Sequence, residues 1–297
     1  MSAPRTTPAP ASWWRWTPPR RSSPTRPTSA PRTTSPDGSG EASSMTEQTR
    51  KTFHAEIEEI SDLIVQLAAR AGDSVARATD ALLTYDLAEA QQIIDDDDAI
   101  DVAALEVEER CQSLLALQQP MAGDLRQILA AMWITAELER TGGLACNICK
   151  GARRMFPAEL PPKLRGLIAE MSEEAIRLIR LSVDSYSERD AGLASALDDI
   201  DDRLDSLHRV FVRNLLEVSR SKDLDVQPAM QLALIARYYE RIGDHAVNVS
   251  DRVRYMVSGV MPWRDKMTRH PTREESVVQD PSPGSTEVSP NGENKTD

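Results

Sequence analysis

The sequence predicts an all-α protein built from six long helices, and three observations carry this prediction. Apolar residues recur every three or four positions through most of residues 53–258. No stretch of useful length alternates β-branched or aromatic residues with polar ones, as a half-buried strand would. The central region, residues 45–263, contains only six of the 19 prolines. Helices of roughly 30 residues can therefore form there without interruption.

The first helix is predicted over residues 53–82, where Phe53, Ile57, Ile60 and Ile64 begin a continuous apolar stripe. Similar patterns predict five further helices, over residues 87–118, 121–155, 160–187, 190–220 and 228–258. The breaks between them fall near Tyr85-Asp86, Gln119-Pro120, Phe156-Pro157, Arg189-Asp190 and Gln227-Pro228.

The six helices are two copies of a set of three. Residues 86–101 resemble residues 190–205 at a constant offset of 104, and residues 139–148 resemble residues 240–249 at an offset of 101. Both matches fall on corresponding helices of the two halves. The repeat predicts two three-helix bundles related by pseudo-twofold symmetry, the first over residues 45–156 and the second over residues 157–263.

The two ends of the chain differ in composition from the middle. Residues 1–44 contain nine prolines and six arginines, and residues 264–297 contain four prolines. We expect both segments to be disordered, because they cannot bury enough apolar surface to offset the entropy of ordering. Met45 resembles a natural start, so residues 1–44 are expected to be an extension of the reading frame; the alternative is a basic tail that contacts a partner.

The charge and the cysteines narrow the function classes. The net charge of −12 becomes −14 within residues 45–263, which argues against nucleic-acid binding and favours metal cations. No run approaches the ~20 apolar residues of a membrane span. Three cysteines form no even disulfide framework, so a reducing cytoplasm is expected. We interpret Cys146 and Cys149 as small apolar helix residues rather than as a zinc or redox site.

Carboxylates interrupt the apolar stripe of two helices in the second half. Asp201 and Asp205 are four residues apart in the fifth helix, and Glu240 and Asp244 are four apart in the sixth. Residues at this spacing share one helix face, where unpaired like charges repel. Two such helices facing each other would form an all-oxygen site for Mg²⁺, Ca²⁺, Mn²⁺, Fe or Zn²⁺. The alternative is an exposed acidic face.

The first half carries a weaker version of this pattern. Asp97, Asp101 and Glu139 occupy corresponding positions, but Gly143 stands where the second half has Asp244. A metal site here would lack one ligand and bind more weakly. We expect His245 to serve a hydrogen-bond network rather than a metal, because its carboxylate neighbours suffice as ligands.

Three segments resemble the PhoU family. They are Phe53-His54, residues 115–126 (LALQQPMAGDLR) and residues 239–248 (YERIGDHAVN). The resemblance implies paired three-helix bundles, usually dimeric, with multinuclear metal clusters. The family's Glu/Asp-x-x-x-Asp motifs fall on Asp97 with Asp101, Asp201 with Asp205 and Glu240 with Asp244, whereas Glu139 with Gly143 departs from the pattern.

The resemblance also implies a function. PhoU proteins are cytoplasmic negative regulators of phosphate uptake and of the phosphate regulon. The resemblance implies that the protein links the ATP-binding subunit of the phosphate ABC transporter to a membrane sensor histidine kinase. The residues themselves leave two alternatives open, a metal-dependent helical-bundle enzyme and a metal-storage protein. No nucleophile–base pair or glycine-rich phosphate loop is visible, so we expect a protein that is not an enzyme.

Overall fold

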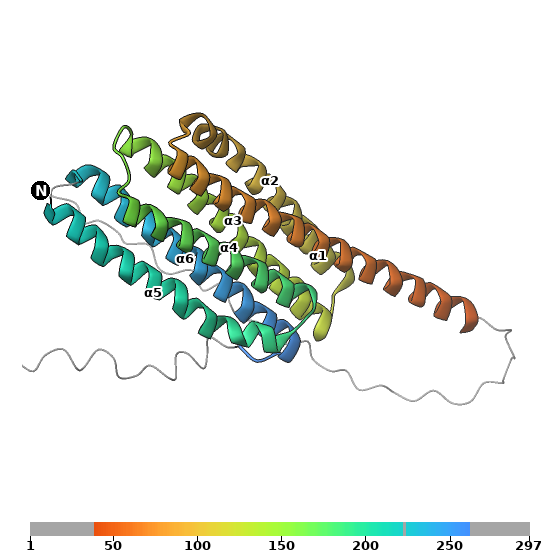
Figure 1. Cartoon of the computed structure of the whole chain (residues 1–297). Coiled ribbons are helices and arrows are strands. Elements are labelled where there is room, and N and C mark those ends of the chain that lie inside the picture. Colours follow the sequence, from red (N-terminus) through yellow and green to blue (C-terminus); the bar gives the residue numbers. More distant parts are fainter. Residues whose placement is uncertain (1–38, 222–223, 262–297) are drawn as a thin grey trace, which may run out of the picture. The chain divides into compact units, whose positions relative to one another are not determined.

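The computed structural model describes residues 39–221 and 224–261, which form six helices joined by short connections (Figure 1). All six predicted helices are present, and the described residues contain no strand, which confirms the all-α class. The helices are α1 (Ser39–Thr84), α2 (Leu87–Gln118), α3 (Gly123–Met155), α4 (Pro162–Ser187), α5 (Ala191–Ser221) and α6 (Val226–Ser258).

Helix α1 begins earlier than its apolar stripe predicts. Its first residue is Ser39, so residues 39–44 are helical although they belong to the segment expected to be disordered. Residues 39–52 lack proline and are mostly polar, so they permit a helix without producing an apolar period. The rest of that segment, residues 1–38, and the whole predicted tail, residues 264–297, lie outside the described residues.

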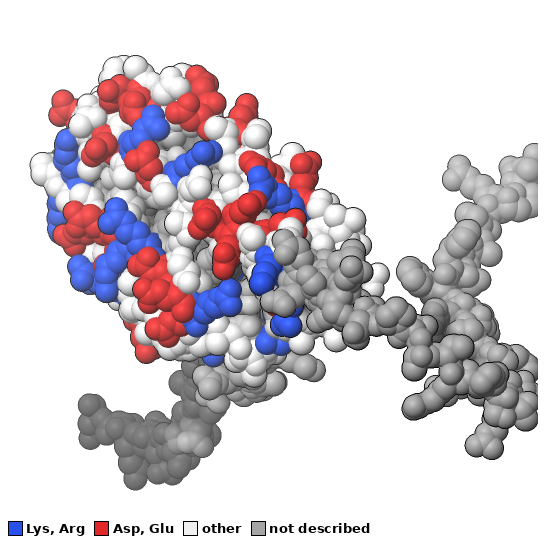
Figure 2. All heavy atoms as spheres, turned by 90° about the vertical axis from the view of Figure 1, so that its right-hand side faces the viewer, with Lys and Arg blue, Asp and Glu red and all other residues white. Residues whose placement is uncertain are grey.

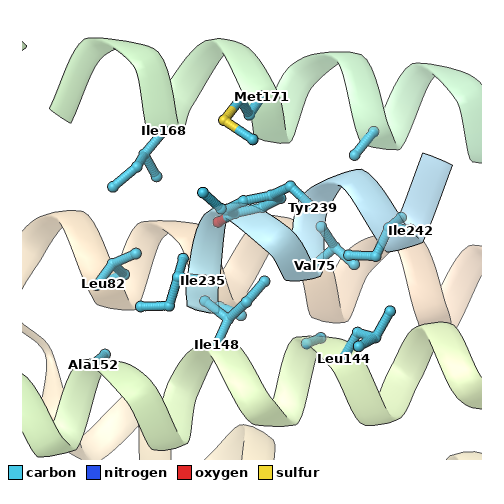
Figure 3. Close-up of a cluster of buried hydrophobic side chains, with 14 of the residues drawn as sticks. Val75, Leu82, Leu144, Ile148, Ala152, Ile168, Met171, Ile235, Tyr239 and Ile242 are labelled. Carbon is cyan, nitrogen blue, oxygen red and sulfur yellow. The ribbon is translucent and has the colours of Figure 1, made fainter. Parts of the chain in front are cut away.

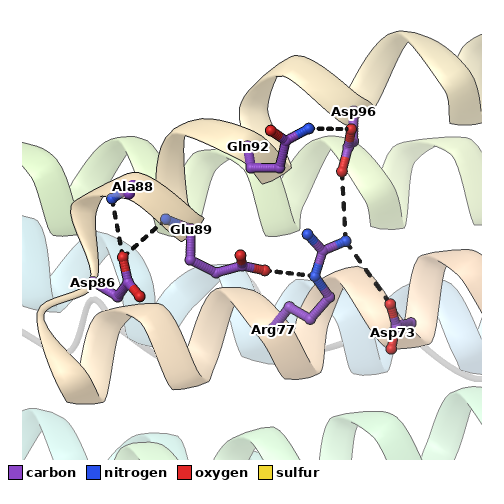
Figure 4. A network of polar contacts seen from close by, with 7 residues as sticks. All are labelled: Asp73, Arg77, Asp86, Ala88, Glu89, Gln92 and Asp96. Atoms are coloured by element: carbon purple, nitrogen blue, oxygen red, sulfur yellow. Dashed lines mark hydrogen bonds and ion pairs between the residues drawn. The ribbon is translucent and has the colours of Figure 1, made fainter.

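The turns before α2 and α5 repeat the same local structure. Tyr85 and Arg189, 104 residues apart, both have a left-handed backbone conformation, with φ of 59° and 53°. Each is followed by an aspartate, Asp86 or Asp190, whose carboxylate accepts hydrogen bonds from the backbone N–H groups two and three residues further on. Figure 4 shows this cap at Asp86. The sequence repeat is therefore also a repeat of turn and cap.

Helices α3 and α6 pack against each other at the centre of the bundle and run antiparallel. The Nε atom of Arg126, near the start of α3, donates to the carbonyl oxygen of Met256 near the end of α6, at 3.3 Å. At the opposite end the side chain of Gln227 donates to the carbonyl oxygen of Arg154, at 2.8 Å. Arg126 and Gln227 are 101 residues apart, the offset of the repeat in this region. Helix α2 packs on α3, and α5 packs on α6.

A buried hydroxyl network joins α1 to α4 and α6. The Oγ1 atom of Thr79 lies 2.8 Å from the Oγ atom of Ser172 and 2.7 Å from the hydroxyl of Tyr239, and it donates to the carbonyl of Val75. Tyr239 is fully buried. Since buried polar groups are costly unless hydrogen-bonded, this network fixes how α1 meets the other half of the repeat.

The hydrophobic core consists of two clusters, and each includes residues from both halves of the repeat. One contains Val75, Ile148 and Tyr239 among its members, so it spans α1, α3 and α6 (Figure 3). The other contains Phe53 from α1 and Val253 from α6. The described residues from Glu47 onward accordingly belong to one compact unit. The predicted boundary between the two three-helix repeats, at residues 156 and 157, stays a prediction.

The surface carries acidic and basic side chains close together. Arg77 of α1 pairs with Glu89 at 2.6 Å and with Asp96 at 3.5 Å, both on α2, and with Asp73 of its own helix (Figure 4). Red and blue residues are interspersed across the face shown in Figure 2. Pairs of this kind contribute little individually, because solvent screens them. None of the helices in the described ranges has the length and apolar character needed to cross a membrane.

Candidate metal centre

The four carboxylates predicted in the second half lie on two helices that pack directly against each other. Asp201 and Asp205 are on α5, and Glu240 and Asp244 are on α6. Asp201 interacts electrostatically with Asp205 on its own helix and with Asp244 across the helix contact. Asp244 in turn interacts with Asp205. The three aspartates therefore interact electrostatically across the contact between α5 and α6.

Gly243 allows α5 and α6 to approach closely at this point. A Cβ atom built on Gly243 would lie 2.4 Å from the Oδ1 atom of Asp201 and 2.8 Å from the Cδ2 atom of Leu204. No side chain fits at that position unless both neighbours move. A glycine inside a helix costs about 1 kcal/mol relative to alanine. The close approach of Asp201 accounts for its presence.

The carboxylate of Asp201 is electrostatically unsatisfied. Its Oδ1 atom is buried and has no hydrogen-bond partner among the described residues. Burial, followed by the charges of Asp205 and Asp244, raises the pKa of Asp201 from 3.8 to about 7. A carboxylate in this environment requires either a proton or a cation.

Arg237 contacts one of the predicted ligands, although the sequence patterns did not single it out. It forms an ion pair with Glu240, three residues further along α6. Burial raises the pKa of Asp244, while Arg237 opposes that rise and Asp205 adds to it. Burial and then Arg237 lower the pKa of His208, which lies on α5. The three-residue spacing of Arg237 and Glu240 was the available signal in the sequence.

Two observations fit a cation in the second half. The buried Oδ1 atom of Asp201 has no hydrogen-bond partner among the described residues, and its carboxylate interacts with the charges of Asp205 and Asp244. Across residues 39–221 and 224–261, however, no three His, Cys, Asp or Glu side chains converge closely enough to hold a metal ion. Glu240 turns toward Arg237 instead. The metal at these four residues stays a prediction.

The first half has the same helix approach with different contacts. Asp97 and Asp101 lie on α2 and Glu139 lies on α3. A Cβ atom built on Gly142 would lie 2.9 Å from the Cδ1 atom of Ile100 and 3.7 Å from the Oδ1 atom of Asp97. Burial and then the charge of Asp101 raise the pKa of Glu139. The aspartate thus stands further from the α3 backbone than Asp201 stands from that of α6.

Asp97 has a protein partner that its counterpart Asp201 lacks. Burial raises the pKa of Asp97, and a hydrogen bond with Cys146 opposes that rise, as does the charge of Lys150. Lys150 also forms a hydrogen bond with the Cys146 thiol. Cys146 and Cys149 are both buried and free, as expected for small helix residues. The polar contacts of Cys146 were not anticipated, because they depend on the register between α2 and α3.

His245 contacts α3. It is buried, and its Nδ1 atom lies 3.3 Å from the Oγ1 atom of Thr141 on α3. Burial, and then Arg241 and Arg140, lower its pKa to about 4. The contact with Thr141 agrees with a role of His245 in hydrogen bonding.

Comparison with known proteins identifies the family. The model of the PhoU domain matches the chain twice, at residues 64–152 and 168–253. The phosphate-specific transport system accessory protein PhoU homolog 1 of Mycobacterium tuberculosis is 37% identical over 222 residues, which cover 74% of this chain and all of that protein. The PhoU homolog of Aquifex aeolicus is 36% identical over 187 residues, which cover 63% of this chain and 84% of that protein.

Solved structures agree with the sequence relatives. The crystal structure of PhoU from Pseudomonas aeruginosa superposes with a TM-score of 0.66 and 26% identity, covering 70% of this chain and all of that one. The phosphate transport system regulatory protein PhoU from Streptococcus pneumoniae superposes equally well at 22% identity, which supports the fold alone. The helical bundle, the internal repeat and the two domain matches place this chain in the PhoU family.

Proposed function

We propose that this protein is an accessory regulator of phosphate transport that restrains phosphate uptake and phosphate-regulon signalling. The observation that carries the proposal is the similarity to the M. tuberculosis accessory protein along that protein's whole length. The two domain matches, one on each side of residues 156–157, extend the similarity to both repeats. An accessory protein acts by binding, so we propose no catalytic step.

The proposed partners are the ATP-binding subunit of the phosphate ABC transporter and a phosphate-sensing histidine kinase. We propose that the protein acts in the cytoplasm and forms a homodimer, as membership of the PhoU family implies. Its long helices offer extended faces on which two different proteins could dock.

We further propose that Asp201, Asp205, Glu240 and Asp244 hold divalent or trivalent metal ions such as Fe, Zn, Mn or Mg. The unpartnered Oδ1 atom of Asp201 and its interaction with the charges of Asp205 and Asp244 support this. The ion would neutralise repelling carboxylates and link α5 to α6. Glu240 would exchange Arg237 for the metal.

Metal analysis tests the site. Purified Glu240→Ala/Asp244→Ala protein should contain less metal than the unmodified chain and keep its helical circular dichroism. Asp199→Ala/Asp202→Ala is a matched control, because both residues are exposed on α5. Full metal stoichiometry in the first double variant would reject the site assignment.

Affinity capture tests the regulatory role. The full chain should retain the transporter ATPase and the sensor kinase from a lysate of its own host, with retention that differs between phosphate-rich and phosphate-poor growth. Deletion of the gene should raise expression of phosphate-starvation genes when phosphate is plentiful. If neither partner is captured and expression is unchanged, the proposed function is wrong.

A further inference from the structure

A groove with a volume of about 370 Å³ lies between α1 and α4. Its lining is mostly apolar and includes the buried side chains of Ala68, Ile179 and Val183. Val65, which also lines it, is 40% exposed. A Cβ atom built on Gly72, another lining residue, would meet nothing within 4 Å. The described residues therefore leave apolar surface uncovered between two packed helices, where another helix could lie.

This α1/α4 groove also carries charged side chains of both signs. Arg180 and Asp184 line it from α4, and Asp73 lines it from α1. All three residues are exposed, and neither Arg180 nor Asp184 forms an ion pair within the described part of the chain. Asp73 contacts Arg77 of its own helix only at 4.0 Å. The groove thus presents one positive and two negative groups that have no close partner among the described residues.

A second copy of this chain is the occupant that matches this mixture of charges. In a twofold interface the same patch meets itself, so the patch must contain both a charge and its opposite. With α1 of one copy lying over α4 of the other, Arg180 of one copy faces the partner's Asp73. A partner with a purely acidic or purely basic surface would instead place like charges opposite each other, which is unfavourable.

The size of this surface also suits a stable dimer. Helix α4 has 26 residues, so it is about 39 Å long. Helix α1 lies beside it along its length, because α1 forms hydrogen bonds with Tyr186 at one end and with the backbone of Leu160 at the other. Two packed helices, each about 10 Å wide, present a surface of about 780 Å². A standard interface buries about 800 Å² on each partner.

We infer that the α1/α4 groove is the surface through which two copies of this chain form a homodimer. The inference rests on the proposed homodimer and names the residues that form its interface. Twofold packing buries the exposed part of Val65 and fills the open space beside Gly72. The ion pair between Arg180 and the partner's Asp73 occurs twice, once on each side of the axis, and fixes the register of the two copies.

Exchange of charges tests the pairing in the full chain. Arg180→Asp places acidic groups opposite each other, and Asp73→Arg/Asp184→Arg places basic groups opposite each other. Each variant alone should dimerise at least about tenfold more weakly than the unmodified chain, measured by analytical ultracentrifugation. An equimolar mixture of the two should recover the affinity, because opposite charges meet again. Arg213→Asp, an equal change of charge at an exposed position of α5, is the control and should have no effect.

Two results of the charge exchange would overturn the inference. One is dimerisation of the single variants as tight as that of the unmodified chain. The other is a mixture that associates no better than its components. Circular dichroism should show that each variant is folded, as the exposure of the three substituted residues predicts.

Filling the groove gives an independent test. Gly72→Phe adds a side chain where the described residues leave open space, so the monomer should keep its fold while dimerisation weakens at least about tenfold. The control is Gly166→Phe, because Gly166 is exposed on α4, does not line the groove and also has nothing within 4 Å of its Cβ position. Equal dimerisation of the two variants would overturn the inference. If Gly72→Phe fails to fold, the charge exchange still decides.

The outcomes separate this inference from the proposed function. A dimer that is unaffected in both tests has its interface elsewhere, so the inference fails while the homodimer stands. An unmodified chain that sediments only as a monomer rejects both the inference and the homodimer, whereas the regulatory role is decided by affinity capture. Loss of transporter or kinase capture in Gly72→Phe, with dimerisation unchanged, would show that a different protein occupies the groove and would also overturn the inference.

Discussion

The Oδ1 atom of Asp201 lies 2.4 Å from the point that a Cβ atom on residue 243 would occupy, so Gly243 is the contact that seats this carboxylate against α6. The next residue of α6, Asp244, interacts with Asp201 electrostatically. A single missing methyl group therefore determines how closely the acidic faces of α5 and α6 meet.

Replacing Gly243 by alanine should destabilise the protein by about 1–3 kcal/mol, because Asp201 and Leu204 must move. The matched control is Gly143→Ala on α3, where the added methyl group meets open space. That change should stabilise the protein by up to about 1 kcal/mol through helix propensity. Urea denaturation followed by circular dichroism, with a chelator present, measures both. Equal effects of the two substitutions would contradict the close contact.

Asp201 should make the stability of the metal-free protein depend on pH. Its pKa is about 7 in the folded chain and near 3.8 when unperturbed, so the folded state binds the proton more tightly. The contribution is fully present below pH 4 and is lost as the pH rises toward and through 7. Asp201→Asn should therefore stabilise the protein at pH 8 and have little effect at pH 4.

Chemical denaturation across this pH range, with chelator, is the measurement for Asp201→Asn. Asp199→Asn, an exposed aspartate on the same helix, is the control and should show no comparable trend. A stabilisation that is the same at pH 4 and pH 8 would show that Asp201 is not the group concerned. Added metal should reverse the trend, because a metal binds the ionised carboxylate.

The helix caps should contribute equally in the two halves. Asp86→Ala and Asp190→Ala each remove the acceptor for two backbone N–H groups, and each should cost about 1 kcal/mol. Asp86→Ser and Asp190→Ser keep a capping oxygen and should recover most of that loss. Thermal or urea unfolding would reveal any difference between the halves. A cost confined to one of them would show that the repeated turn does not have the same energetic role.

Substitutions in the buried hydroxyl network should lower the stability of the protein by different amounts. Thr79→Val preserves shape but leaves the hydroxyls of Tyr239 and Ser172 without their partner, which should cost about 1–3 kcal/mol. Tyr239→Phe should cost less, because Thr79 keeps Ser172 and the carbonyl of Val75. Thr84→Val is the control, since its exposed hydroxyl bonds only to its own helix. A larger cost for Tyr239→Phe than for Thr79→Val would contradict this arrangement.

The spacing of apolar residues predicts most of the fold, because it indicates which face of each helix is buried. The break at Tyr85-Asp86 can be predicted, because an aspartate just before a helical pattern of apolar residues is a capping signal. In the structure, α1 ends at Thr84 and α2 begins at Leu87. The start of α1 is not readable in this way. The sequence from Ser39 to the start of the apolar stripe shows no helical spacing of apolar residues, so the pattern does not predict a helix there.

The candidate site, too, is predictable from the sequence only in part. The spacing of Asp201 and Asp205 against the apolar stripe predicts that both lie on the α6 side of their helix, and both interact electrostatically with Asp244. The contact between Asp97 and Cys146 could not be predicted, because it depends on how far α2 slides along α3. Register between helices is a property of packed side chains and leaves little trace in periodicity.

Each hydrophobic cluster draws on both repeats, so neither repeat has a core of its own. A polypeptide consisting of one repeat would leave the apolar face of its third helix in water. It would need a second copy to cover that face, and the antiparallel contact of α3 with α6 has the geometry of such a twofold pairing. The connection through residues 156–161 then converts an association between two molecules into one within a single molecule. The core consequently assembles at the same rate whatever the protein concentration.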